Sequence, residues 1–115
     1  MFSGDMRVYI AVGVTDMRKS IDGLSILVSE QMDLDPFAGH LFAFSNRSRS
    51  IVKVLYWDRN GFCIWHKRLE KDKFRWPESR EEVLEVGRRE LSWLLDGLDI
   101  KQGLGHARRK YSRVF

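Results

Sequence analysis

The side chains most able to do chemistry are three histidines (His40, His66 and His106) and a single cysteine, Cys63. A zinc site needs several such ligands at short spacings, and no two of these histidines have the spacing of ligands on one helix. Cys63 lies in an apolar run, where a thiol usually packs as a small, inert hydrophobic group. We therefore expect no metal, no cofactor and no nucleophilic thiol.

Four aspartates form the other candidate site: Asp16, Asp22, Asp33 and Asp35. Two-metal phosphoryl transfer needs carboxylates that converge on cations ~4 Å apart. Asp16 is better explained as a helix cap and Asp22 as part of a polar helix face. The chain also lacks a phosphate-cradling glycine loop and a Gly-x-Ser-x-Gly elbow. The prediction is a protein without catalytic residues, and a metal nuclease using Asp16 and Asp22 is the weaker alternative.

Aromatic and basic residues alternate through positions 51–76. A sheet with this composition can stack bases on its aromatic rings, at ~1–3 kcal/mol per base, while its cations contact phosphates. The alternative is that the aromatic side chains simply form the core. The candidate nucleic-acid-binding residues are Arg47, Arg49, Lys53, Lys67, Arg68, Lys73, Arg75, Arg108, Arg109 and Lys110.

Charge is unevenly distributed along the chain, although the net charge is only +4. Residues 40–76 carry 9 basic and 3 acidic groups, and residues 101–115 carry 5 basic groups and no acidic one. Residues 1–39 and 77–100 are acidic on balance. The two basic blocks fit a polyanionic partner such as DNA. A solvated surface followed by a frayed end would account for the same pattern.

The hydrophobic periodicity predicts an α+β fold. After a first strand, a helix beginning near Thr15 or Asp16 should run through residues 17–28, followed by an antiparallel meander and a C-terminal helix packed on the sheet. We expect four to five strands in all. The predicted strands are 7–14, 40–46, 51–57, 62–69 and a short one at 73–76; residues 79–85 are a loop or short helix, and the last helix is 88–98. Gly87 should cap that helix, with the Glu90 side chain reaching back to its N–H, and Gly97 should end it.

The turn Asp58-Arg59-Asn60-Gly61 sets the pairing of the central hairpin. We interpret it as a type I turn followed by a glycine bulge, which places Asp58 opposite Phe62 and Lys53 opposite Lys67. A two-residue turn would shift the register by one residue and exchange the faces. Both faces of this hairpin are apolar near the turn, so either helices cover both faces or one face meets a partner.

The length of 115 residues suits one domain. We assign residues 1–100 to it and treat 101–115 as a basic, poorly ordered tail. No apolar run is long enough to span a bilayer, and the N-terminus lacks the pattern of a signal peptide, so we expect a cytoplasmic protein without membrane contact.

Three stretches of the chain resemble a known family. They are residues 13–24 (GVTDMRKSIDGL), residues 35–42 (DPFAGHLF) and residues 55–77, which begin LYWDRNGF and end FRWP. This set is similar to the TnpB accessory proteins of the bacterial insertion-sequence family numbered sixty-six, and the likeness covers residues 7–100. The family often has Ser or Thr where this chain has Gly87, and Gly in the turn where it has Asp72.

The resemblance implies a mobile-element protein that acts beside a separate, larger transposase carrying the catalytic triad. It supplies no catalytic residues to transfer to this chain. The predicted function is therefore a non-catalytic accessory role in transposition, with binding to DNA, to the cognate transposase, or to both. The alternative is an interaction or homodimerisation module without direct DNA contact.

Overall fold

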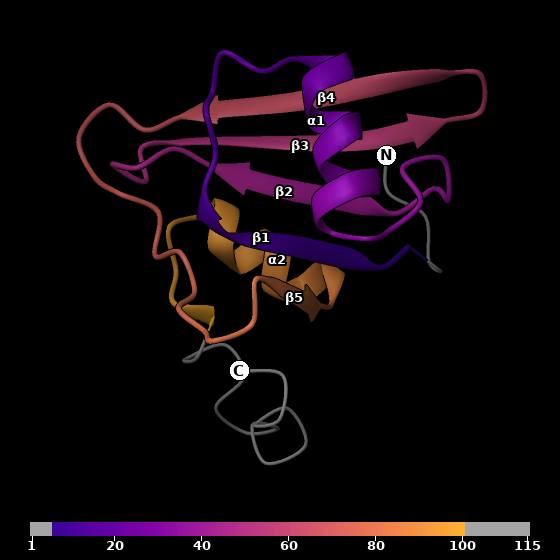
Figure 1. Ribbon diagram of the computed structural model, residues 1–115. Helices are drawn as coiled ribbons and strands as arrows, with labels where there is room; N and C mark the ends of the chain where they lie inside the picture. The colour runs from indigo at the N-terminus through magenta and orange to yellow at the C-terminus, as the bar shows by residue number, and fades with distance from the viewer. Residues whose placement is uncertain (1–5, 101–115) are drawn as a thin grey trace.

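The computed structural model describes residues 6–100, which form a five-stranded sheet with helices on both sides (Figure 1). The strands lie in the order β4-β3-β2-β1-β5. The elements are β1 (Val8–Val14), α1 (Ile21–Ile26), the π-helical continuation η1 (Leu27–Gln31), β2 (Leu41–Ser45), β3 (Ile51–Asp58), β4 (Gly61–Arg68), β5 (Val83–Val86) and α2 (Arg88–Leu95). The α+β class is confirmed, and the predicted tail at 101–115 lies outside the described residues.

The sheet is mixed, so the expectation of an antiparallel sheet is wrong at one pair of strands. β1 and β2 pair in parallel, with Val8 opposite Leu41 and Ile10 opposite Ala43. Parallel neighbours need a crossover connection, which α1 and η1 supply. The remaining pairs, β2–β3, β3–β4 and β1–β5, are antiparallel, so the meander itself is present.

The first helix begins at Ile21, later than predicted, because Asp16 has another role. Its carboxylate accepts the backbone N–H of Arg18 and so closes a tight turn ahead of the helix. The N-cap residue is Ser20, which makes no capping hydrogen bond through its side chain. The residues between the turn and the helix therefore form a short linker over the sheet.

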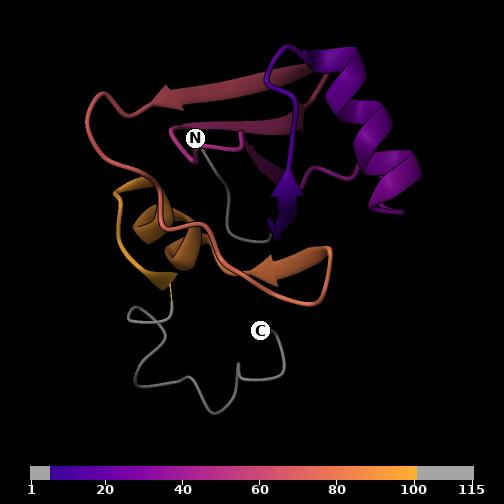
Figure 2. The same ribbon diagram turned by 60° about the vertical axis from the view of Figure 1, so that its left-hand side comes forward.

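Each face of the sheet has its own core, because α1 and α2 lie on opposite sides (Figure 2). On one side, Leu24 and Val28 of α1 and η1 pack on Phe42, Phe44 and Leu55. On the other side, α2 packs on a second cluster that includes Val8, Ile10, Val52, Val54, Leu91 and Leu94. Coverage by helices, the first of the two explanations for the doubly apolar hairpin, therefore holds where Val52, Val54 and Leu55 are buried.

The hairpin register differs by one residue from the prediction. Asp58 pairs with Gly61 and Trp57 with Phe62, which leaves a two-residue turn. Arg59, with φ 57°, adopts the left-handed conformation that we had assigned to the glycine. In consequence Lys53 lies opposite His66 instead of Lys67, and the two lysines project from opposite faces.

The fifth strand is also not the predicted one. Residues 73–76 form no strand, although Phe74 and Trp76 are buried in the core beneath α2. The strand that completes the sheet is β5, which overlaps the predicted loop or short helix at 79–85 and ends one residue beyond it. The acidic residues before β5 obscured its short Val-Leu-Glu-Val pattern.

The start of α2 and the glycine that follows its last turn match the sequence prediction. The Glu90 carboxylate accepts the Gly87 N–H at 2.8 Å, as in a capping box. Gly97, with φ 85°, follows the last turn and donates its N–H to the Leu94 carbonyl at 3.0 Å. The helix stops at Leu95, three residues earlier than expected. No helix among residues 6–100 has the length and apolar character needed to cross a membrane.

Candidate nucleic-acid interface

Two basic segments that are distant in sequence meet at one end of the sheet. The 46–50 turn is held by Asn46, whose Oδ1 accepts the N–H groups of Ser50 and Ile51 at 3.0 Å. The segment after β4 then crosses this turn, and the Phe74 N–H donates to the Arg49 carbonyl at 2.7 Å. Residues 47–49 and 73–75 therefore lie side by side.

Arg49 is the structural anchor of this end. Its guanidinium donates to the Val12 carbonyl at 3.0 Å and to the Gly13 carbonyl at 3.3 Å. It also lies 5.7 Å from the centre of the Trp76 ring, at a cation–π distance. Burial lowers the pKa of Arg49. Arg49 was predicted to contact DNA, but its guanidinium N–H groups already bind carbonyls of β1.

The cations near Arg49 differ from it in having side chains that bind no other described residue. Arg47, Lys71, Lys73 and Arg75 are exposed, and no hydrogen bond or ion pair joins their side chains to any described residue. Lys73 and Arg75 are exposed on either side of the buried Phe74. We call these four residues the basic edge. Three were predicted from the sequence, and Lys71 was not among the candidates.

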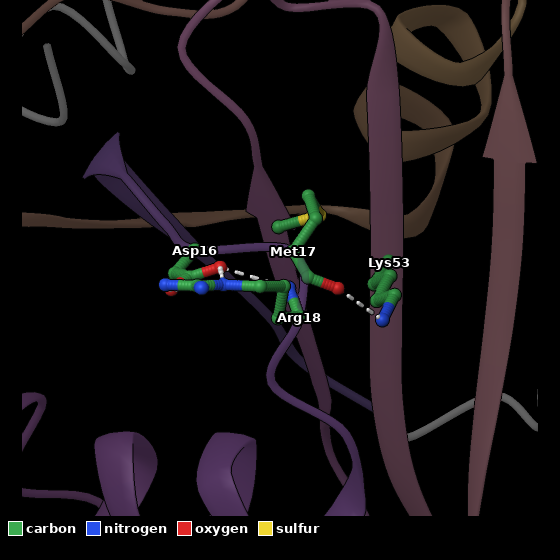
Figure 3. Close-up of polar contacts among 4 residues, drawn as sticks. All are labelled: Asp16, Met17, Arg18 and Lys53. Carbon is green, nitrogen blue, oxygen red and sulfur yellow. Dashed lines mark hydrogen bonds and ion pairs between the residues drawn. The ribbon is translucent and has the colours of Figure 1, made fainter.

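Three other predicted cations have partners within the fold. The Lys53 ammonium donates to the carbonyls of Met17 and Lys19 at 2.8 and 2.9 Å, and Figure 3 shows the first of these bonds. The Lys67 ammonium donates to the Leu95 carbonyl at the end of α2, at 2.8 Å. Arg68 pairs with Glu70 at 2.9 Å. The remaining candidates, Arg108, Arg109 and Lys110, lie outside the described residues.

The carboxylates considered for metal chemistry are dispersed. Asp16 binds the Arg18 guanidinium at 2.7 Å (Figure 3). This side-chain hydrogen bond, with the Arg18 N–H, lowers the pKa of Asp16 to about 2. Asp22 is exposed on α1, and residues 6–100 hold no group of three or more His, Cys, Asp or Glu side chains that could bind a metal ion.

The histidines and the cysteine also have local structural surroundings. His40 accepts the Arg7 N–H through Nδ1 at 3.1 Å and packs edge-on against Tyr9. His66 is exposed on β4. Cys63 is half-buried opposite Tyr56, and burial together with Cys63 raises the pKa of that tyrosine.

The aromatic side chains divide between the core and the surface. Phe74 and Trp76 are buried, as the packing alternative predicted. Trp57 and Phe62, however, form a cluster with Phe37 in which ring centroids are 4.9–5.1 Å apart. We call these three residues, with the nearby Ile26, the aromatic patch. Sequence reasoning missed it because Phe37 comes from the loop before β2, far from the hairpin along the chain.

Comparison with known families identifies the chain. The family described as IS66 Orf2 like protein matches residues 6–104. The chain belongs to this family. This match confirms the resemblance drawn from the three sequence stretches. The chain is therefore a transposition-associated accessory protein.

Two relatives of this IS66 Orf2 like protein come from Sinorhizobium fredii. Uncharacterized protein y4hO is 40% identical over 95 residues, which are 83% of each chain. Uncharacterized protein y4jC is 32% identical over 97 residues, 84% of this chain and 83% of its own. No solved structure matches the chain significantly.

Proposed function

We propose that this chain is a non-catalytic accessory protein of insertion-sequence transposition that binds element DNA through the basic edge. The observation that carries the proposal is a set of four exposed cations at one end of the sheet, Arg47, Lys71, Lys73 and Arg75, whose side chains have no partner among residues 6–100. Cations with free donors can contact phosphates and release counterions, which is the main source of sequence-independent affinity for DNA.

The rigid surroundings of the basic edge support this role. Arg49 ties the 46–50 turn to β1, and the bond from Phe74 ties the following segment to the same turn. The exposed side chains are thus presented from a fixed backbone. Cations held in this way retain a defined spacing toward a phosphate backbone, whereas cations on an independent loop would not.

The non-catalytic part of the proposal rests on the state of the acidic groups. A metal nuclease would need Asp16 to bind a cation, but its carboxylate accepts three hydrogen bonds from the Arg18 guanidinium and one from the Arg18 N–H. In the proposed division of labour, the cognate transposase breaks and joins the DNA strands.

The test is a fluorescence-anisotropy titration of the purified full chain with element-end DNA. Substituting all four basic-edge residues with Gln should weaken binding at least ~10-fold at 0.1 M salt, since each phosphate contact contributes separately. The matched control replaces Lys19, Arg59, Arg80 and Arg89, which are equally exposed elsewhere, with Gln. Equal losses in both variants would show nonspecific charge attraction and refute the assignment to the basic edge.

A nuclease assay completes the test. The pure protein should leave the same DNA intact with Mg²⁺ or Mn²⁺. Metal-dependent cutting that Asp16→Asn abolishes would contradict the non-catalytic assignment.

A further inference from the structure

The aromatic patch lies at the end of the sheet opposite the basic edge. Phe37 and Ile26 are 57% and 52% exposed, and both line a hollow between α1 and the loop before β2. Trp57 and Phe62 extend this apolar surface onto the β3–β4 hairpin, whose turn lies beside that loop in Figure 1. Within residues 6–100, Phe37 and Ile26 are thus left exposed, and Trp57 and Phe62 lie half-buried beside them.

The helix and the loop that contribute Ile26 and Phe37 to the patch are acidic, and the hairpin turn beside them adds one charge of each sign, Asp58 and Arg59. Residues 20–39 contain Asp22, Glu30, Asp33 and Asp35 but no Lys or Arg. All four carboxylates are exposed, and none forms an ion pair with a described residue. Asp22 and Glu30 lie one turn before and after Ile26, on the same side of the helix. We call these four residues the acidic rim.

The combination of aromatic patch and acidic rim selects the kind of partner. Exposed, clustered aromatic rings are typical anchors of protein interfaces, where desolvation of a few large side chains supplies most of the affinity. The surrounding negative charge attracts cationic groups and repels phosphates. A nucleic acid is therefore disfavoured at this end, although aromatic rings alone could stack with bases.

We propose that the aromatic patch and its acidic rim are a docking site for a protein segment that carries apolar side chains among lysines and arginines. Apolar side chains of that segment pack on Phe37 and Ile26, and its cations pair with Asp22 and Glu30. This partner is the cognate transposase, so the inference rests on the proposed function and gives it a second, separate binding surface.

The experiment measures binding of two probes, purified cognate transposase and element-end DNA, to the same full-length variants. In the first variant, Ile26→Ser is combined with Phe37→Ala; both side chains are more than half exposed, so the fold should be retained, and circular dichroism checks this. We expect transposase binding to fall at least 10-fold while DNA affinity changes less than twofold. Unchanged transposase binding would overturn the proposal.

A second variant tests the charge of the partner without touching the apolar groups. Asp22→Asn with Glu30→Gln should weaken transposase binding about threefold or more and reduce its dependence on salt. The matched control, Glu78→Gln with Glu81→Gln, removes two exposed carboxylates elsewhere and should leave binding unchanged. Equal effects of the two pairs would contradict a local acidic rim.

The remaining outcomes separate this inference from the proposed function. If the patch variant loses DNA affinity but keeps transposase affinity, the rings are a base-stacking site and the docking proposal is wrong. If the unaltered chain fails to bind transposase with or without DNA, the docking proposal is also wrong. If it binds transposase through the patch but never binds DNA, the docking site stands and the proposed DNA-binding function fails.

Discussion

A lysine can hold a phosphate only when its ammonium group is not already bound within the fold. Lys53 and Lys67 lie on strands, and their ammonium groups reach back to carbonyls of the linker before α1 and of the end of α2. Lys73 has no such partner in the part of the chain that the structure describes. Residues of one type and similar spacing therefore divide into structural and exposed cations according to which carbonyls lie within reach.

This difference predicts opposite consequences for two substitutions. Lys53→Met removes the donor to the Met17 and Lys19 carbonyls and should lower the free energy of unfolding by about 1–3 kcal/mol. Lys73→Met should change that free energy by less than about 0.5 kcal/mol while weakening DNA binding. Urea denaturation and anisotropy on both variants measure the two effects. An unchanged stability with weaker DNA binding for Lys53→Met would contradict the structural assignment.

The Asp16–Arg18 pair predicts a pH dependence confined to acid. The pKa of Asp16 is lowered from 3.8 to about 2 in the folded chain. Because the folded value lies below the ordinary one, the pair contributes stability above pH 3.8, and this contribution is lost as the pH falls toward 2. An NMR titration of the Asp16 carboxyl carbon should show a midpoint near pH 2.

The matching variant for this titration is Arg18→Ala, which should return the midpoint toward 3.8. Arg7→Ala is the control: it removes an arginine that pairs with Glu85 and not with Asp16, and it should leave the Asp16 midpoint unchanged. A midpoint near 4 in the unaltered chain would mean that the ion pair does not form in solution.

At the level of elements, β4 is an edge strand of the sheet, and no strand among residues 6–100 pairs with its outer side. Leu69 donates its N–H to the Ser50 carbonyl, and this bond shows which residue pairs of β3 and β4 are hydrogen-bonded. Cys63, Trp65 and Lys67 therefore bond to β3, because hydrogen-bonded and non-bonded pairs alternate in an antiparallel ladder. The N–H groups of the residues between them point away from the sheet.

Hydrogen exchange should show this alternation directly. The N–H groups of Phe62, Ile64 and His66 should exchange much faster than those of Cys63 and Trp65. Residue-resolved exchange by NMR at low protein concentration is the measurement. Protection of both sets under those conditions would contradict a free edge and show that another strand pairs with β4.

Sequence reasoning recovered those elements whose cause is local. Four of the five strands follow from the alternation of apolar and polar residues. The N-terminal cap of α2 follows from the contact between Glu90 and Gly87, and its end from the left-handed Gly97. The parallel β1–β2 pairing had a signal in the strand–helix–strand order, which is typical of a parallel crossover. The place of β5 beside β1 depends on which strands meet in space. The hairpin register failed because Arg59 accepts a conformation that the prediction reserved for glycine.

The candidate site was predictable to a similar extent. Charge along the chain led to Arg47, Lys73 and Arg75, which are exposed, but also to Lys53, whose role depends on a linker 34–36 residues away. The aromatic patch needed the tertiary contact between Phe37 and the hairpin. Its only signal in the sequence was the Asp-Pro-Phe stretch within a block without basic residues.

For the whole molecule, β3 separates two surfaces of opposite character. The basic edge adjoins the start of this strand and the aromatic patch its end, so eight strand residues at ~3.3 Å each place them roughly 25 Å apart. That separation exceeds the Debye length of ~8–10 Å at physiological ionic strength. The acidic rim therefore leaves phosphate binding at the basic edge largely unaffected, and the two surfaces can act independently.

The salt dependence of DNA binding tests this independence. On duplex DNA each phosphate contact contributes about 0.9 to the slope of log affinity against log salt concentration. Replacing the four basic-edge residues with Gln should therefore reduce the slope by roughly 3–4, and the Ile26→Ser/Phe37→Ala variant should leave it unchanged. Replacing Arg108, Arg109 and Lys110 with Gln measures the share of the C-terminal segment. If only this last variant changed the slope, the phosphate contacts would belong to the C-terminal segment, and the basic edge would have no part in holding DNA.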